Sequence, residues 1–341
     1  MQVLRSLFSA FWILFFLSSS CFATDQAIDI LKNRFSFSDK DITDLMSGKV
    51  ISKVLDHKDK REIAVLGATV IDIPKESVID SIRDIQTFKK GKEVLAVGKF
   101  TKFDADEIKT LVLDDSELDL IQNCKLRDCD IKLPSGWIQE LAAEKDRSRK
   151  VEVLRKLLVD YSKEYLNQGN KVIVEYDNED HPIRVQDEFQ AVLEQSSSYL
   201  VALAPEFHDY LKNFPDNSPN DADGFVYWSK EKFGFKPVIS LTHVSIYKQS
   251  DGADSRYFIA SKQIFADHYY DASLGLTFLI DHPLAGNKMG CYLIYMNRSR
   301  IDALDGFLSS LRRAIATPRV RKGLETNLKL LRDRLEDKET K

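Results

Sequence analysis

Five strand-like segments follow one another in the last third of the chain, with only short turns between them. They cover Phe225–Trp228, Pro237–Tyr247, Arg256–Ala266, Tyr269–Ile280 and Cys291–Met296. Regular strands with short connections favour an antiparallel sheet. The sequence therefore predicts that this part of the chain forms one large antiparallel sheet.

The segments before and after this region complete an α+β pattern. Further strands are expected at Val50–Leu55, Arg61–Ile71 and Val94–Phe100, with a helix after Pro74. Residues 101–224 instead show helical periodicity, with stripes of apolar residues at spacings of three and four. The clearest of these stripes comprises Val151, Leu154, Leu158, Tyr161 and Tyr165. After the last strand the chain turns helical again, and we expect Pro318 to divide that helical region into two.

This order of elements resembles the helix-grip fold of the START-like (polyketide cyclase-like) superfamily, in particular its exported members. The similarity lies in the residue patterns of Phe37–Ile51, Gly67–Pro74 and Val78–Asp84, and again in Tyr227–Gly234 leading into Pro237–Tyr247. It implies an α+β fold in which a helix-grip antiparallel sheet wraps on a long C-terminal helix, with a mainly helical insertion. The implied divisions are 24–100 and 225–316 for the START-like domain, 101–224 for the insertion and 317–341 for a C-terminal amphipathic helix.

The resemblance also implies a cavity for a lipid or another apolar molecule between the sheet and the last helix. In this arrangement Ile301–Ala316 forms a lid helix over the open face of the sheet. Five apolar residues share one face of that helix and should turn inward: Leu304, Phe307, Leu308, Leu311 and Ile315.

Polar residues on the later strands are the candidate ligand contacts. His243 shares a strand face with Tyr247, and if that face lines the cavity, His243 anchors the polar head of a ligand. Gln263 and Tyr295 are similar candidates, and Leu308 is the candidate contact from the lid. The alternative for each polar residue is an ordinary packing role. Tyr269–Tyr270 is a further aromatic pair that suits either a pocket mouth or strand packing.

Motifs for other chemistries are missing from the sequence. It contains no Gly-rich phosphate loop, no His-Glu-x-x-His and no Gly-x-Ser-x-Gly, and its six His residues are scattered. We therefore expect neither a metal nor a cofactor. The formal net charge of -4 does not suit a nucleic-acid binder.

The first 23 residues have the features of a secretory signal peptide. Arg5 is their only charge, an apolar run follows at Leu7–Leu17, and small residues precede Thr24. The alternatives are a lipoprotein anchor on Cys21 and an uncleaved anchor. Export to a periplasmic or extracellular space makes a disulfide between Cys124 and Cys129 the expected state of that pair, with two unpaired surface thiols as the alternative. Cys291 lies in an apolar run and is expected to be buried.

The C-terminal residues are strongly basic. Residues 311–341 carry ten basic and five acidic side chains. Such a helix suits contact with anionic lipid head groups, or it presents a solvated polar face opposite a packed leucine stripe, and we favour the second interpretation.

Three functions follow from these observations, in order of preference. The first is non-catalytic binding, with or without shuttling, of a lipid or other apolar small molecule in an internal cavity. The second is an enzyme of the cyclase or hydrolase type that uses inward polar groups such as His243. The third is a protein-interaction module that uses the helical insertion.

Overall fold

The computed structural model describes residues 27–232, 234, 236–251, 254–306 and 309–339. The expected signal peptide with Cys21 lies outside the described residues, as do Phe307 and Leu308 of the expected lid. In the described part of the chain, no helix is both long enough and apolar enough to cross a membrane.

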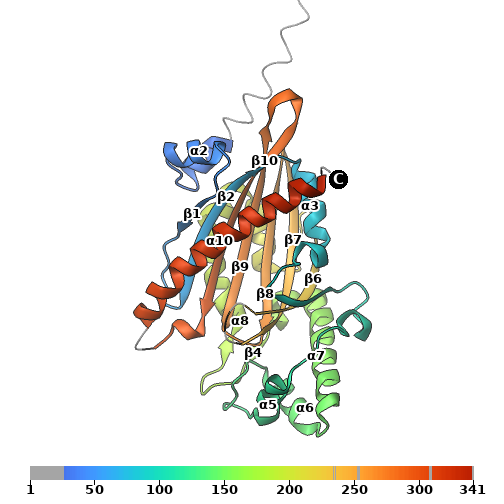
Figure 1. The fold of residues 1–341 in the computed structure, drawn as a ribbon. Coiled ribbons are helices and arrows are strands. Elements are labelled where there is room, and N and C mark those ends of the chain that lie inside the picture. Colours follow the sequence, from blue (N-terminus) through green and yellow to red (C-terminus); the bar gives the residue numbers. More distant parts are fainter. Residues whose placement is uncertain (1–26, 233, 235, 252–253, 307–308, 340–341) are drawn as a thin grey trace, which may run out of the picture.

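An eight-stranded antiparallel sheet forms the centre of the molecule (Figure 1). Its strands are β1 (Ile51–Val54), β2 (Glu62–Ile71), β3 (Val94–Lys99), β6 (Ala222–Glu231), β7 (Val238–Asp251), β8 (Asp254–Ala266), β9 (Tyr270–Pro283) and β10 (Met289–Ile301). They are ordered β1-β2-β10-β9-β8-β7-β6-β3, so the five C-terminal strands pair in sequence as predicted. β2 closes one side of that series and β3 the other, which is an α+β arrangement consistent with a helix-grip fold.

Helices occupy both faces of the sheet. They are α2 (Asp39–Met46), α3 (Lys75–Arg83), α4 (Ile85–Phe88), α5 (Asp115–Asn123), α6 (Ser135–Ala143), α7 (Arg147–Gln168), α8 (Val185–Leu203), α9 (Pro205–Asn213) and α10 (Ser309–Glu339). Short 3₁₀ turns are η1 (Ala105–Ile108), η2 (Gly169–Val172), η3 (Ala285–Asn287) and η4 (Asp302–Leu304), and a small hairpin pairs β4 (Glu175–Tyr176) with β5 (Ile183–Arg184).

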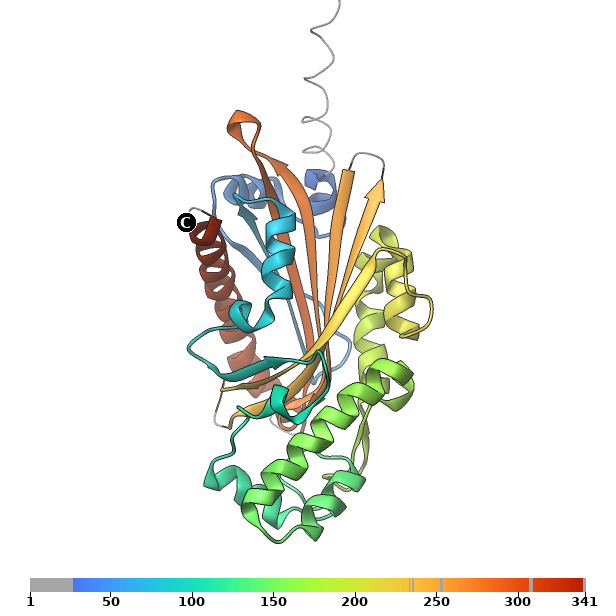
Figure 2. The same cartoon turned by 90° about the vertical axis from the view of Figure 1, so that its right-hand side faces the viewer.

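Both faces of the sheet are buried, because successive strand residues point to opposite sides. On β2, Val65 belongs to one apolar cluster and Leu66 to the other. The same alternation separates Leu293 from Ile294 on β10. Figure 2 shows the two coverings: α3 and α10 lie on one side of the curved sheet, and the helices of the insertion lie on the other. We call these the α10 face and the insertion face.

The C-terminal helix packs through its second half. Leu324 and Leu328 lie directly over Gly67 of β2, where an added Cβ would come within 2.5 Å of Leu328 Cδ1. Only a glycine lets the helix approach this closely. Arg334 Nη1 then donates to the carbonyl of Phe88 at 3.0 Å, which joins the end of α10 to α4.

The expected lid is wrong in two respects. α10 runs without interruption through Pro318, and Leu311 and Ile315 are 58% and 49% exposed. The turn around Pro318 is exposed, so the Ala314 carbonyl that loses its helical donor can be hydrated. Burial of the leucines further along the helix offsets the cost of the proline. Leu304 is buried as expected, but it lies in η4 rather than in a helix over the sheet.

The insertion packs on the opposite face as a mainly helical layer. Leu154, Leu158 and Tyr165 of α7 are buried, as the apolar stripe predicted. The hydroxyl of Tyr161 donates to the carbonyl of Ile264 at 2.9 Å, which ties α7 to strand β8.

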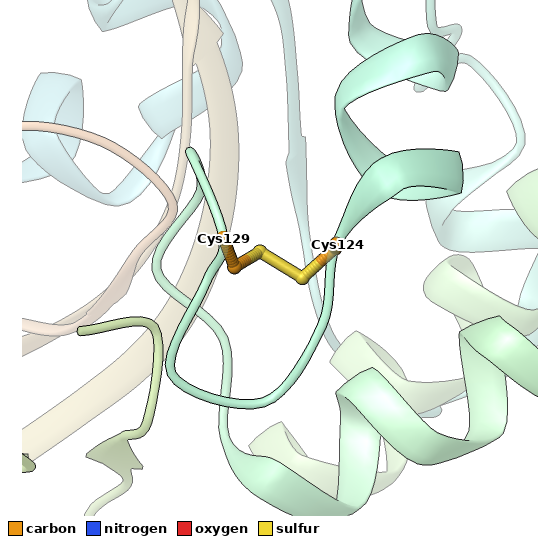
Figure 3. The surroundings of a disulfide bond; sticks show 2 residues. All are labelled: Cys124 and Cys129. Carbon is orange, nitrogen blue, oxygen red and sulfur yellow. A yellow bond between two sulfur atoms is a disulfide. The ribbon is translucent and has the colours of Figure 1, made fainter. Parts of the chain in front are cut away.

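Cys124 and Cys129 form a disulfide at the end of α5, with Cα atoms 4.4 Å apart (Figure 3). Cys291 is a free, fully buried thiol on β10, and burial raises its pKa. The structure therefore agrees with the prediction for all three cysteines.

Candidate functional site

The α10 face of the sheet changes from apolar to polar along its strands. Its polar part comprises Ser261 and Gln263 of β8, Ser273, Gly275 and Thr277 of β9, and Tyr295, Asn297 and Ser299 of β10. The hydroxyls of Ser273 and Ser299 lie 2.8 Å apart, and Ser299 donates to Asn297 Oδ1 at 2.8 Å. Ser261, Gln263, Thr277 and Tyr295 are partly exposed.

Tyr295 of β10 extends over Gly275 of the neighbouring strand β9. A Cβ at Gly275 would lie 3.0 Å from the Tyr295 hydroxyl, so the absent side chain leaves the space that the phenol crosses. Beyond Gly275 lies β8, where Ser261 pairs with Gly275 and Gln263 is two residues further on the same face. Two of the candidates from the sequence, Gln263 and Tyr295, therefore lie on one surface.

A charged and phenolic cluster adjoins this surface. Lys89, just after α4, pairs with Glu231 at the end of β6, with Nζ and Oε1 2.7 Å apart. The same nitrogen lies 5.8 Å from the ring centre of Tyr227. Lys89 and Glu231 both act electrostatically on Tyr270 and Tyr295, which places the five groups together. We call these residues the Lys89 cluster.

Three members of the cluster, Lys89, Tyr270 and Tyr295, have raised pKa values. Burial disfavours the charged form of Lys89, but Tyr227 and Glu231 outweigh that effect and raise the pKa of the ammonium. Burial raises the pKa of Tyr270 to about 12. It also raises the pKa of Tyr295, although Lys89 opposes the shift. At neutral pH Lys89 is therefore an ammonium and Tyr270 and Tyr295 are uncharged phenols, so all three groups can donate hydrogen bonds.

His243 and Tyr247 lie on the insertion face instead. His243 is 2% exposed, with Nδ1 3.1 Å from the Tyr165 hydroxyl and its ring centre 4.5 Å from that of Phe214. Burial, reinforced by the nearby Lys262, lowers the pKa of His243 to about 3. Tyr247 donates to Glu206 Oε2 of α9 at 3.2 Å. The structure thus separates these two residues from Gln263 and Tyr295, and Leu308 lies outside the described residues.

Sequence reasoning missed most of the Lys89 cluster. Its members are distant in the chain, and no sequence motif assigns a chemical role to Lys89 or Glu231. Two of its members had a signal: Tyr295 was a candidate ligand contact, and the aromatic pair Tyr269–Tyr270 indicated a pocket mouth or strand packing. Among the described residues, no three His, Cys, Asp or Glu side chains gather in a way that would hold a metal ion.

Comparison with known proteins adds no family to this description. No protein-family model matches the sequence, and a search of curated proteins finds no match.

Proposed function

We propose that this protein is an exported START-like protein that binds a lipid or another apolar small molecule on the α10 face. The observation that carries the proposal is the junction of an apolar and a donor-rich surface on one face of the sheet. Leu293 and Ile259, each 2% exposed, lie on the apolar part, which is buried beneath the helices of this face, while Gln263, Tyr295 and Lys89 lie at the partly exposed polar end. An amphipathic ligand matches this arrangement, because its head group accepts hydrogen bonds at the polar end while its body packs among the apolar side chains beneath the helices.

Shuttling of the ligand to or from a membrane is the second part of the proposal. The outer side of α10 exposes the apolar residues Leu311, Ile315 and Leu330 among the exposed basic residues Arg319, Lys322 and Lys329. A helix with exposed apolar and basic residues suits the surface of an anionic membrane. Export is supported by the signal-like first 23 residues and by the disulfide between Cys124 and Cys129.

One observation favours an enzyme as the second candidate. Lys89, Glu231 and three tyrosines converge on one surface, and converging titratable groups are typical of catalytic sites. The raised pKa values of Lys89, Tyr270 and Tyr295 oppose this assignment, because a general base must give up its proton near the working pH. Binding therefore suits the cluster better than proton transfer.

The proposal is tested by titrating the mature protein with 11-(dansylamino)undecanoic acid and following the fluorescence of the dansyl group. We expect Tyr295→Phe to weaken binding about 5- to 10-fold, the effect of one lost hydrogen bond of roughly 1–1.5 kcal/mol. Tyr247→Phe makes the same chemical change on the insertion face and should leave the affinity unchanged. Equal affinities for wild type and Tyr295→Phe, or equal losses in both variants, would rule out the α10 face as the site.

A further inference from the structure

A cleft of about 670 Å³ opens where one end of the sheet meets the insertion. Its walls are the disulfide loop (residues 127–130), the β4–β5 loop (178–181), the β8–β9 turn (267–269) and the first residues of η4. In Figure 1 this region lies around β4, at the end of the sheet that adjoins α5. None of the residues of the Lys89 cluster lines this cleft, which we call the end cleft.

Main-chain hydrogen bonds hold the walls of the end cleft together. The amide of Arg127 donates to the Asp177 carbonyl at 2.8 Å, and the amide of Cys129 donates to the Asn178 carbonyl at 3.1 Å. The amide of Lys132 donates to the Asp267 carbonyl at 2.8 Å, which joins the insertion to the β8–β9 turn. The disulfide closes the first loop on itself. The cleft is therefore shaped before any ligand arrives, which lowers the entropic cost of binding.

The end cleft is acidic. Six carboxylates line it, against three basic side chains. One of those basic groups, Lys132, is already neutralised by Asp271, with Nζ and Oδ1 2.6 Å apart. Four exposed carboxylates form no ion pair with any described residue: Asp128, Asp130, Glu179 and Asp180. Like charges gathered around a concave wall produce a negative potential that attracts cations.

Two buried side chains in the cleft have polar atoms without a partner. Asn178 is 6% exposed and His268 is 7% exposed. Among the described residues, Asn178 Oδ1 and both ring nitrogens of His268 find no hydrogen bond. Nδ1 of His268 lies 3.0 Å from Asp267 Oδ1, but without hydrogen-bond geometry, and that oxygen already accepts from the amide of Ile239 at 2.8 Å. Unpaired buried polar atoms are costly, which makes these atoms sites for a ligand to satisfy.

The backbone of the cleft carries strain at Tyr269. This residue has φ of 65°, a left-handed conformation that is unusual for a bulky side chain. It is held there by Asp302, whose amide donates to the Tyr269 carbonyl at 2.9 Å, and by the amide of Lys236, which donates to the phenol oxygen at 2.9 Å. The conformation keeps the aromatic ring at the cleft wall, where a ring face also attracts cations.

The geometry points to a binding site in the end cleft for an organic cation that carries an ammonium or guanidinium group. The N–H groups of such a ligand donate to Asn178 Oδ1 and to an unprotonated ring nitrogen of His268, and its charge is balanced by the carboxylates of the rim. Free polyamines and the basic side chains of peptides share this chemistry. The inference is independent of ligand binding on the α10 face.

Isothermal titration of the mature protein with spermidine at low ionic strength tests the inference. We expect Asp130→Asn/Asp180→Asn to weaken binding at least tenfold. The control, Glu152→Gln/Asp216→Asn, makes the same change in net charge at exposed residues that do not line the cleft and should alter the affinity less than twofold. Equal losses of spermidine affinity in the two double variants would mean that spermidine responds only to the overall charge of the protein. That result would overturn the proposed site.

A second variant tests the unpaired nitrogens, and two further ligands identify the class. His268→Phe removes both nitrogens, so it should melt at or above the wild-type temperature yet bind spermidine at least threefold more weakly. Unchanged affinity in this variant would contradict the inference.

A short peptide with a single Arg and blocked ends shows whether the basic side chains of peptides enter the end cleft. Calcium that binds more tightly than both spermidine and this peptide would overturn the assignment to organic cations.

Discussion

His243 and Lys262 are partners across β7 and β8, and both are buried, with no carboxylate among the described residues bonded to either side chain. Lys262 donates to Asn170 Oδ1 of η2 and lies 3.9 Å from the ring centre of Phe189 of α8. Burial lowers its pKa well below the ordinary value. Tyr165 of α7 is the titratable group that faces His243 from the insertion. The contact between sheet and insertion is thus built on two bases that are stable there only when uncharged.

Acid should therefore weaken the protein in a definite pH range. The unfolded chain protonates His243 near pH 6.5, whereas the folded chain does so only near pH 3, so the stability that this residue contributes is lost as pH falls between those values. One such group changes the unfolding free energy by at most about 1.4 kcal/mol per pH unit. Urea unfolding at pH 7, 6, 5 and 4 should show that the unfolding free energy falls less steeply with decreasing pH in His243→Gln than in wild type. The exposed His57→Gln should keep the wild-type slope, and equal slopes in all three proteins would contradict the prediction.

Among the secondary-structure elements, α10 shows how tertiary packing overrides a helix-breaking proline. Pro318 predicts a helix end, yet the helix continues because the leucines beyond it bury themselves on β2. The same packing explains why Gly67 is required, since Leu328 occupies the space of its missing side chain.

Substitutions at this contact should be coupled. Leu328→Ala should cost about 2–5 kcal/mol of unfolding free energy, whereas Leu330→Ala, at a residue that is 55% exposed, should cost little. Gly67→Ala alone should destabilise the protein because the new Cβ meets Leu328 Cδ1. In the Leu328→Ala background it should cost less, because that atom is gone. Strict additivity in a denaturation cycle would show that the two residues are not in contact.

At the scale of the whole molecule, one sheet serves as the core of two layers. The cluster on the α10 face and the cluster on the insertion face share the same strands, so neither layer has an independent core. Charged groups strengthen the insertion side, where Arg298 Nη1 pairs with the fully buried Glu62 at 2.6 Å and Arg300 Nη1 with Glu188 of α8 at 2.6 Å.

The shared core predicts a single cooperative unfolding transition. Hydrogen exchange under native conditions should give similar opening free energies for the amides of α7 (Arg147–Gln168) and for those of β9 (Tyr270–Pro283). Fast exchange throughout α7 with full protection of β9 would show that the insertion opens by itself. Tryptophan fluorescence and far-ultraviolet circular dichroism should also unfold at the same urea concentration.

Local signals were enough for the elements and for part of their pairing. Strand-like segments identified the strands between residues 225 and 296, and the short turns between them favoured an antiparallel sheet, in which the structure pairs them in sequence. Helical spacing identified the buried stripe of α7, and the short loop between Cys124 and Cys129 kept the two thiols close. These features depend on residues a few positions apart, so a single sequence is enough to reveal them.

Which layer covers each face of the sheet depends on contacts between distant segments. Alternation shows that His243 and Tyr247 share a face, but not that the insertion, rather than the C-terminal helix, lies on it. The Lys89 cluster and the end cleft also depend on long-range packing, because their side chains come from strands, loops and helix ends more than a hundred residues apart. Most helices and strands follow from the amino-acid sequence alone, because they arise from local geometry, although packing carried α10 through Pro318. The sites arise from contacts between distant segments, which exist only once the sheet has been covered on both faces.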